Sequence, residues 1–170
     1  MRPNLFDPEK ALNAILWIAK RISSPTFHSI SKLLYFADRI HLERYGRLIS
    51  GDSYVAMKHG PVPSGTYDIM KAVRGDGTCA VEDEAQEAFT VDGRHDVIPR
   101  REANEALFSE SDLECLREAI TRYGSLSFKA LTDLSHDAAW DSADENDIIE
   151  LEQIIATLSD GASLLEHLRR

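Results

Sequence analysis

Apolar residues recur at helical spacing near the beginning of the chain. Asp7 and Pro8 predict a helix start, because aspartate can cap free backbone amides and proline at the next position loses no needed donor. A serine-serine-proline run at 23–25 predicts the end of this helix. The apolar positions that recur at helical spacing are Leu12, Ile15, Leu16, Ala19 and Ile22, and Trp17 and Ile18 widen this face. We therefore expect a helix that packs through a broad apolar stripe.

A second helix, from about 26 to 45, has the widest apolar face, and we expect it to be the central helix of the fold. Thr26 suits its amino-terminal cap, and Gly46 supplies the left-handed residue that often ends a helix. The apolar positions in this segment are Phe27, Ile30, Leu33, Leu34, Phe36, Ala37 and Ile40.

The segment that follows predicts strands and turns. Residues 53–58 are β-prone, and the Gly-Pro-Val-Pro run at 60–63 predicts a stiff corner before a third helix, which stops in the glycine-rich turn at 74–77. Residues 87–92 and 96–100 predict a hairpin around the turn at 92–95. Because two short strands are marginal alone, strand 53–58 could add to this hairpin as a third strand.

Helical patterning returns from Ser109 onward. Ser111 and Glu114 read as a capping box, and Gly124 ends that helix. A short helix at 127–135 is expected to turn Phe128, Leu131 and Leu134 inward. The tail, beginning with Ile148 and Ile149, predicts one helix broken near Asp160-Gly161, or two helices. The fold class is thus α+β and helix-dominated, with about six or seven helices around the helix near 26–45 and a small antiparallel sheet of strands at about 53–58, 87–92 and 96–100.

Length and composition favour one domain over two, because 170 residues can bury a sizeable core without metal or disulfide support. The net charge of -10 disfavours a main role in nucleic-acid binding and suits a basic protein partner. Cys79 and Cys115 belong to no metal-binding motif and are expected to be buried or half-buried thiols. The first residues, MRPNLFDPEK, contain no apolar signal-peptide region, and no run approaches the ~18 apolar residues of a membrane span. We expect a cytoplasmic protein without a membrane partner.

Motifs that would indicate catalysis, metal binding or a cofactor are missing. The six histidines form no HxxxH or HExxH pair, and the chain contains no GxGxxG, P-loop or GxSxG motif. An active site built from distant residues stays open, but we nominate no catalytic residue, metal ligand or cofactor.

Several polar and aromatic residues are candidates for binding a protein partner. Tyr35 and Asp38 share one face of the central helix and could lie at the rim of a groove, although Asp38 could instead pair with Arg39, Lys32 or a backbone amide. The His59-Gly60-Pro61 turn allows close backbone approach, as would a simple chain reversal. Helical spacing also relates His136 to Trp140, a pattern that core packing around one hydrogen-bonded imidazole would explain equally well.

An ordered set of segments resembles a known family. The segments are KLLYFAD at 32–38, YGRLI at 45–49, YVAMKHGPVP at 54–63 followed by Tyr67, and LSHDAAW at 134–140. Together they resemble the Panacea domain, the SocA-like antitoxin domain of bacteria and phages, also called phage-associated or GepA-like. The resemblance spans about residues 11–140, and residues 141–170 would form a helical extension of a single domain covering 1–170.

The resemblance implies an antitoxin that neutralises a cognate protein toxin, usually encoded beside it, by binding and not by catalysis. The partner-binding candidates, all of which belong to the matching residues, are Tyr35, Asp38, His59, Gly60, Pro61, Tyr67, His136 and Trp140. Because toxins paired with this domain are diverse, specificity is expected in the hairpin region or in the acidic carboxy-terminal part. A small hydrolase or transferase is the alternative, and a nucleic-acid-binding regulator is a third hypothesis that the charge disfavours. Homo-oligomer formation stays open.

Overall fold

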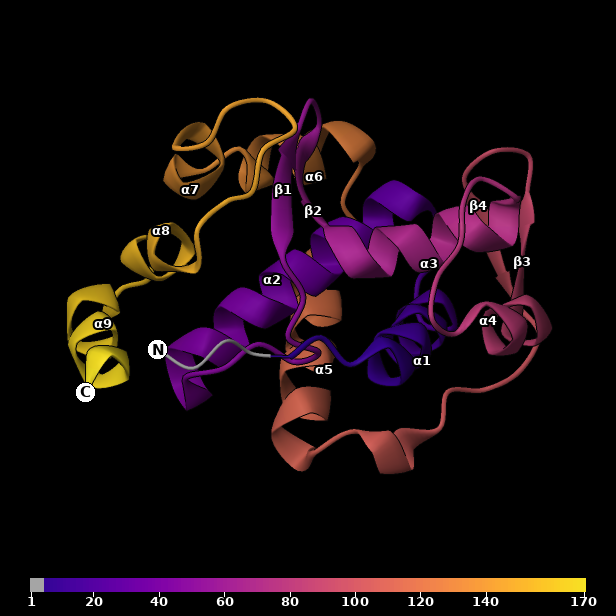
Figure 1. The fold of residues 1–170 in the computed structure, drawn as a ribbon, viewed down its shortest axis with the longest axis horizontal. Coiled ribbons are helices and arrows are strands. Elements are labelled where there is room, and N and C mark those ends of the chain that lie inside the picture. Colours follow the sequence, from indigo (N-terminus) through magenta and orange to yellow (C-terminus); the bar gives the residue numbers. More distant parts are fainter. Residues whose placement is uncertain (1–4) are drawn as a thin grey trace.

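Helix α2 (Phe27–Tyr45) forms the centre of the computed structural model, which describes residues 5–170 (Figure 1). Thr26 caps it, because the Thr26 hydroxyl accepts a hydrogen bond from the Ser29 amide at 3.0 Å. Gly46 ends it with a φ of 76°, a left-handed conformation that glycine adopts without a steric penalty. The prediction of a capped central helix is confirmed.

The described residues form nine α-helices and two small antiparallel sheets, so the predicted helix-dominated α+β class is confirmed. The sequence pattern did not foresee two short helices, α4 and α7. The remaining elements are α1 (Pro8–Ala19), β1 (Tyr54–Met57), β2 (Gly60–Pro63), α3 (Ser64–Arg74), α4 (Glu82–Ala88), β3 (Phe89–Asp92), β4 (Asp96–Pro99), a 3-10 turn (Glu105–Leu107), α5 (Glu110–Tyr123), α6 (Phe128–Ser135), α7 (Ala138–Asp141), α8 (Leu151–Ala156) and α9 (Gly161–Arg169).

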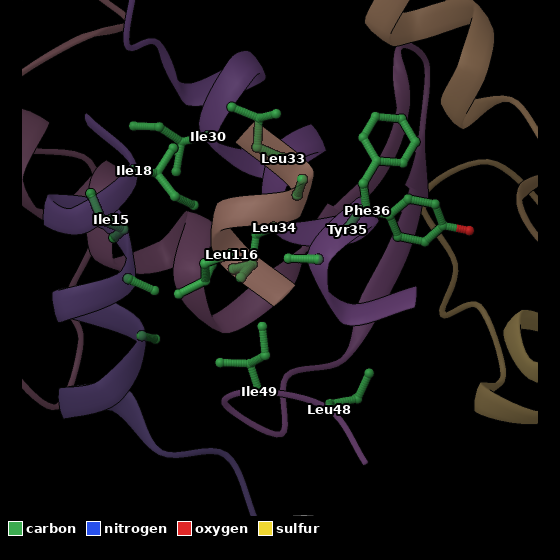
Figure 2. Packing of buried hydrophobic residues seen from close by; sticks show 14 of the residues in the cluster. Ile15, Ile18, Ile30, Leu33, Leu34, Tyr35, Phe36, Leu48, Ile49 and Leu116 are labelled. Atoms are coloured by element: carbon green, nitrogen blue, oxygen red, sulfur yellow. The ribbon is translucent and has the colours of Figure 1, made fainter. Parts of the chain in front are cut away.

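The hydrophobic core surrounds α2. Figure 2 shows Leu33 and Leu34 of α2 close to Ile18 of α1 and Leu116 of α5, all four of them buried. Burial on this scale is the main source of stability in a domain without disulfides. Cys115 is also buried and Cys79 half-buried, as expected, and both are free thiols.

The predicted three-stranded sheet is wrong, because β1 pairs with β2 and β3 pairs with β4 in separate two-stranded sheets. The free edge of β1 is instead covered by residues 146–149, where the Ala56 amide donates to the Asp147 carbonyl at 2.9 Å. The free edge of β4 is covered by residues 25–27 just before α2, where the Val97 amide donates to the Pro25 carbonyl at 2.9 Å. Each hairpin therefore finds its third partner in a segment that has no strand pattern of its own.

The carboxy-terminal half differs from expectation at the cap of α5, at Ile148 and Ile149, and in α6. The α5 cap lies two residues earlier than predicted, because Ser109 and Asp112 exchange the side-chain-to-backbone hydrogen bonds of a capping box. Ile148 and Ile149 are extended against β1 and not helical. The two separate helices that follow, α8 and α9, are one of the two predicted alternatives.

In α6, Leu131 is buried as predicted, but Phe128 and Leu134 are 53% and 52% exposed. Thr132 and Ser135 take inward positions beside Leu131, because polar side chains there find hydrogen-bond partners on α2 and within α6. Among the described residues, no helix is long and apolar enough to cross a membrane.

Candidate partner-binding surface

The β1–β2 hairpin, α6 and α7 lie together on one side of the molecule, at the top of Figure 1. Ser127 caps α6 through the Ala130 amide at 3.1 Å, and Asp137 caps α7 through the Trp140 amide at 3.0 Å. These caps start two short helices in succession and turn the chain between them at His136. The arrangement brings five of the eight candidate residues into this region: His59, Gly60, Pro61, His136 and Trp140.

Trp140 is held from two sides. Its indole N–H donates to the Met57 carbonyl of β1 at 2.8 Å, and its ring stacks on the His136 imidazole at a centroid distance of 3.9 Å and an interplanar angle of 8°. The buried Nε2 of His136 has no hydrogen-bond partner within residues 5–170. The expected pairing of the two side chains is present, and it fixes α7 against the hairpin.

Tyr35 is buried and connects α2 to α7. Its hydroxyl donates to the Asp137 carboxylate at 2.6 Å, and Arg39 lies 3.4 Å from the same carboxylate oxygen. Burial, followed by the Asp137 charge, raises the pKa of the Tyr35 hydroxyl, so it stays a donor at any ordinary pH. Tyr35 therefore orients α7 from inside the protein.

Asp38 is 1% exposed, so its expected position at the rim of a groove is wrong. Its carboxyl group accepts hydrogen bonds from the Ile49 amide at 2.7 Å and from the Tyr54 hydroxyl at 2.6 Å. Burial raises the pKa of Asp38 to about 7 although these two hydrogen bonds lower it. The alternative that Asp38 pairs with a backbone amide is the one that the structure contains, and Asp38 ties α2 to the loop before β1.

Lys32 is a buried ionisable residue that the sequence pattern did not single out. Its side chain is 1% exposed, and its ammonium nitrogen donates to the Pro61 carbonyl of β2 at 2.7 Å. Within residues 5–170 it forms no ion pair. Burial lowers the pKa of Lys32 to about 7. A lysine inside the apolar KLLYFAD run was the available signal, since lysine is rarely buried without a partner.

Gly60 packs directly against this lysine. Its φ is 113°, and a Cβ atom there would lie 2.4 Å from the Ser135 hydroxyl oxygen and 3.1 Å from the Lys32 nitrogen. Pro61 is buried and presents its carbonyl to Lys32. The turn thus permits the close approach expected of it, but the approach is to α2 and α6 inside the protein.

Three aromatic rings line the outer side of this turn. The Phe128 ring stacks on His28 at 3.8 Å and meets His59 edge-on at 5.2 Å. The pKa of His28 is lowered to about 4, mainly by burial and to a smaller extent by the nearby charges of Lys32 and His59. The His28 ring is therefore neutral at physiological pH. His59 and Phe128 are exposed. Of the candidates on the turn, His59 is therefore the one whose side chain reaches the surface.

Tyr67 lies apart from the other candidates. Its ring meets Phe27 edge-on at 5.7 Å, near the amino-terminal end of α2, and Lys71 lies over the ring at 5.9 Å. The structure therefore does not bring all eight candidates to one place.

The structure also contains a serine–histidine pair, the kind of contact that a remote-residue hydrolase would need. The Ser111 hydroxyl lies 2.9 Å from Nε2 of His41, whose Nδ1 lies 2.8 Å from the Arg47 carbonyl. The His41 side chain is fully buried beside Asp112. We interpret the pair as a contact that joins α2 to α5. No group of three or more His, Cys, Asp or Glu side chains in the described part of the chain is placed to hold a metal ion.

The fold and these contacts describe a helix-dominated α+β domain organised around one buried helix. The chain belongs to the antitoxin SocA-like, Panacea domain family, whose family model matches residues 30–141. The match begins inside α2 and ends with the last residue of α7, so α1 and residues 142–170 lie outside it. No curated protein and no solved structure matches the chain.

Proposed function

We propose that the protein is an antitoxin that neutralises a cognate protein toxin in the cytoplasm by direct binding, without catalysing a reaction. The observation that carries the proposal is the family match, which covers most of the central helix, both hairpins and α5 to α7. A binding function, in contrast to catalysis, is consistent with buried polar side chains that hold helices and strands together and are not free to react. Tyr35, Asp38 and Lys32 each use their polar atoms inside the protein.

The exposed apolar side chains around the β1–β2 hairpin support a protein partner. Phe128 and Leu134 of α6 are about half exposed, and Ile148, which bridges to Val55 of β1, is 54% exposed. Exposed apolar side chains that come from adjoining elements are typical of protein-binding surfaces. With His59 and Trp140, they are the residues that we expect to contact the toxin.

We further propose that residues 1–170 act as one domain in which 141–170 form an extension that contributes to partner choice. The extension packs on the part of the fold that the family model matches: residues 146–149 pair with β1, and Arg39 of α2 hydrogen-bonds to Thr157 beside α8. Its buried apolar residues, which belong to the hydrophobic core, are Ile149, Ile154, Ile155 and Leu158. The exposed side chains of this segment can vary without disturbing the core, provided that its buried residues are kept. Exchanging residues 141–170 with those of a relative should redirect neutralisation, and unchanged partner choice would contradict this part of the proposal.

Coexpression tests the main proposal. The reading frame beside the gene is expressed from an inducible promoter, alone and together with this protein. We expect growth arrest when that frame is expressed alone, rescue by coexpression, and a complex of the two purified proteins that elutes as one species. If no adjacent frame is toxic and the purified protein turns over a substrate, the antitoxin proposal fails.

A further inference from the structure

A hollow of about 280 Å³ lies beside Trp140, between α7 and the β1–β2 hairpin. It is lined by Ala56, Lys58, Trp140, Asp141, Ala143 and Glu145. The volume suits a single long side chain, and the lining combines an indole ring and two alanines with charged groups at the edge. The hollow therefore differs from an ordinary acidic surface, because Trp140 and the two alanines give it an apolar side of fixed shape.

The indole wall is held rigidly. The indole N–H donates to the Met57 carbonyl, and the His136 ring stacks on one face of the indole. The Trp140 backbone amide donates to the Asp137 carboxylate. A side chain that enters the hollow would therefore meet an indole that is already in position. Pre-organisation of this kind reduces the entropy lost on binding.

The charged groups beside the indole are mainly acidic. Asp141 and Glu145 are exposed, and neither forms an ion pair with another residue in the described part of the chain. The loop continues with three further exposed carboxylates, Asp144, Asp147 and Glu150, which are likewise free of ion pairs within residues 5–170. Lys58 is the one cationic side chain in the lining, and it is exposed as well.

We propose that this hollow receives an arginine side chain of the partner protein. The alkyl stem and the planar guanidinium fit against the indole, and the guanidinium can form bidentate hydrogen bonds with a carboxylate of Asp141 or Glu145. Arginine suits the site better than lysine, because an ammonium offers neither the planar surface nor the paired donors. The inference rests on the proposed function to the extent that the arginine belongs to a bound protein toxin.

Charge complementarity supports a basic partner over a neutral one. The chain has a net charge of -10, so a basic surface is attracted before contact, and a central arginine in a desolvated pocket commonly contributes strongly to protein–protein affinity. Lys58 works against the same cation, because its ammonium adds a like charge to the lining.

The first experiment needs no toxin. The protein is labelled with 5-fluorotryptophan and titrated with N-acetyl-arginine N-methylamide, while the uncharged citrulline analogue serves as the matched probe. The chain has two tryptophans, and Trp17 is buried with its own Arg21 over the ring, so its resonance is an internal reference. We expect the Trp140 resonance to shift saturably with the arginine probe and to move at least about fivefold less with citrulline, which lacks the charge-assisted hydrogen bonds.

Variants assign the shift to the hollow. Asp141→Asn with Glu145→Gln should abolish the response to the arginine probe, whereas Lys58→Met should tighten binding by about two- to fivefold. Asp68→Asn with Glu87→Gln is the matched control, because both residues are exposed, form no ion pair in the described part of the chain and lie on α3 and α4 away from α7 (Figure 1). An equal shift with citrulline, or an unchanged response in the Asp141/Glu145 variant, overturns the inference.

A second experiment uses the purified toxin and separates this inference from the proposed function. We expect the Asp141/Glu145 variant to bind the toxin at least about tenfold more weakly at low salt, while the Asp68/Glu87 control binds like the wild type. Neutralisation by the wild type with no loss in the Asp141/Glu145 variant overturns the arginine pocket and leaves the antitoxin function standing. Lack of any toxin binding by the wild type overturns the antitoxin function, whatever the arginine probe does.

Discussion

Replacing Lys32 with methionine should make the protein more stable at neutral pH. Burial lowers the pKa of Lys32 from 10.5 to about 7. At about 1.4 kcal/mol per pH unit, this difference corresponds to about 5 kcal/mol of free energy spent on burying the ammonium. Methionine has nearly the same length and no charge. It leaves the Pro61 carbonyl without its donor, which costs about 1–3 kcal/mol, so the net gain is about 2–4 kcal/mol.

The sign of the pH dependence follows from the lowered pKa. Below about pH 7, Lys32 is protonated in both the native and the unfolded states, and the native state bears the full cost of the buried charge. Between about pH 7 and 10.5, the unfolded chain binds a proton that the native protein does not, so the free energy of unfolding of the wild type rises with pH. The advantage of Lys32→Met should therefore shrink by about 1.4 kcal/mol per pH unit above about pH 7.

Urea denaturation followed by circular dichroism, at about pH 6 and about pH 9, measures this difference. Lys58→Met makes the same substitution at an exposed lysine and should change stability by less than about 0.5 kcal/mol at either pH. As a second readout, loss of the Lys32 charge should raise the pKa of His28, which proton NMR can follow. A stability difference between wild type and Lys32→Met that stays constant with pH would refute this account of Lys32.

Three further predictions concern the contacts around α2. Gly60→Ala should lower the free energy of unfolding by more than about 3 kcal/mol, because residue 60 has a φ of 113° and a Cβ atom has no space there. Gly75→Ala is the control: its φ is 102° but nothing lies within 4 Å, so thermal or urea unfolding should show a loss of only about 1–2 kcal/mol. The free energy of unfolding of Asp38→Asn should rise by up to about 4 kcal/mol relative to that of the wild type as the pH goes from about 4 to 8. The reason is that the pKa of Asp38 is raised to about 7, so the wild type loses stability as the pH rises toward that value. A pH-independent difference would contradict this prediction. Tyr35→Phe should cost about 1–2 kcal/mol by removing a buried hydrogen bond, and Tyr45→Phe, at an exposed tyrosine, less than about 0.5 kcal/mol; equal effects in urea unfolding would refute a specific role for Tyr35.

The family motifs mark the inside of the protein more than its surface. Among the candidate residues, Tyr35, Asp38, Gly60 and Pro61 are buried, and each holds α2 to another element. We infer that such residues are required for the scaffold, while partner recognition uses exposed side chains such as Phe128 on the outside of the same elements.

Local signals in the sequence were enough to predict the main helices. The caps at Asp7 and Thr26, the left-handed Gly46 and the apolar stripe of α2 each depend on residues within one or two turns, so their effects can be read from neighbouring positions. The hairpin at β3–β4 was predictable for the same reason, because its turn residues lie between its two strands.

Tertiary structure alone decided what covers each element. Residues 146–149 cover β1 although they carry no strand pattern, because a strand edge accepts any backbone that can reach it and hydrogen bonds do not depend on side-chain type. Burial of Asp38 and Lys32 likewise depends on Tyr54 and Pro61, residues 16 and 29 positions away. Periodicity shows which side of a helix is apolar, but the partner that satisfies a polar group on that side comes from elsewhere in the chain.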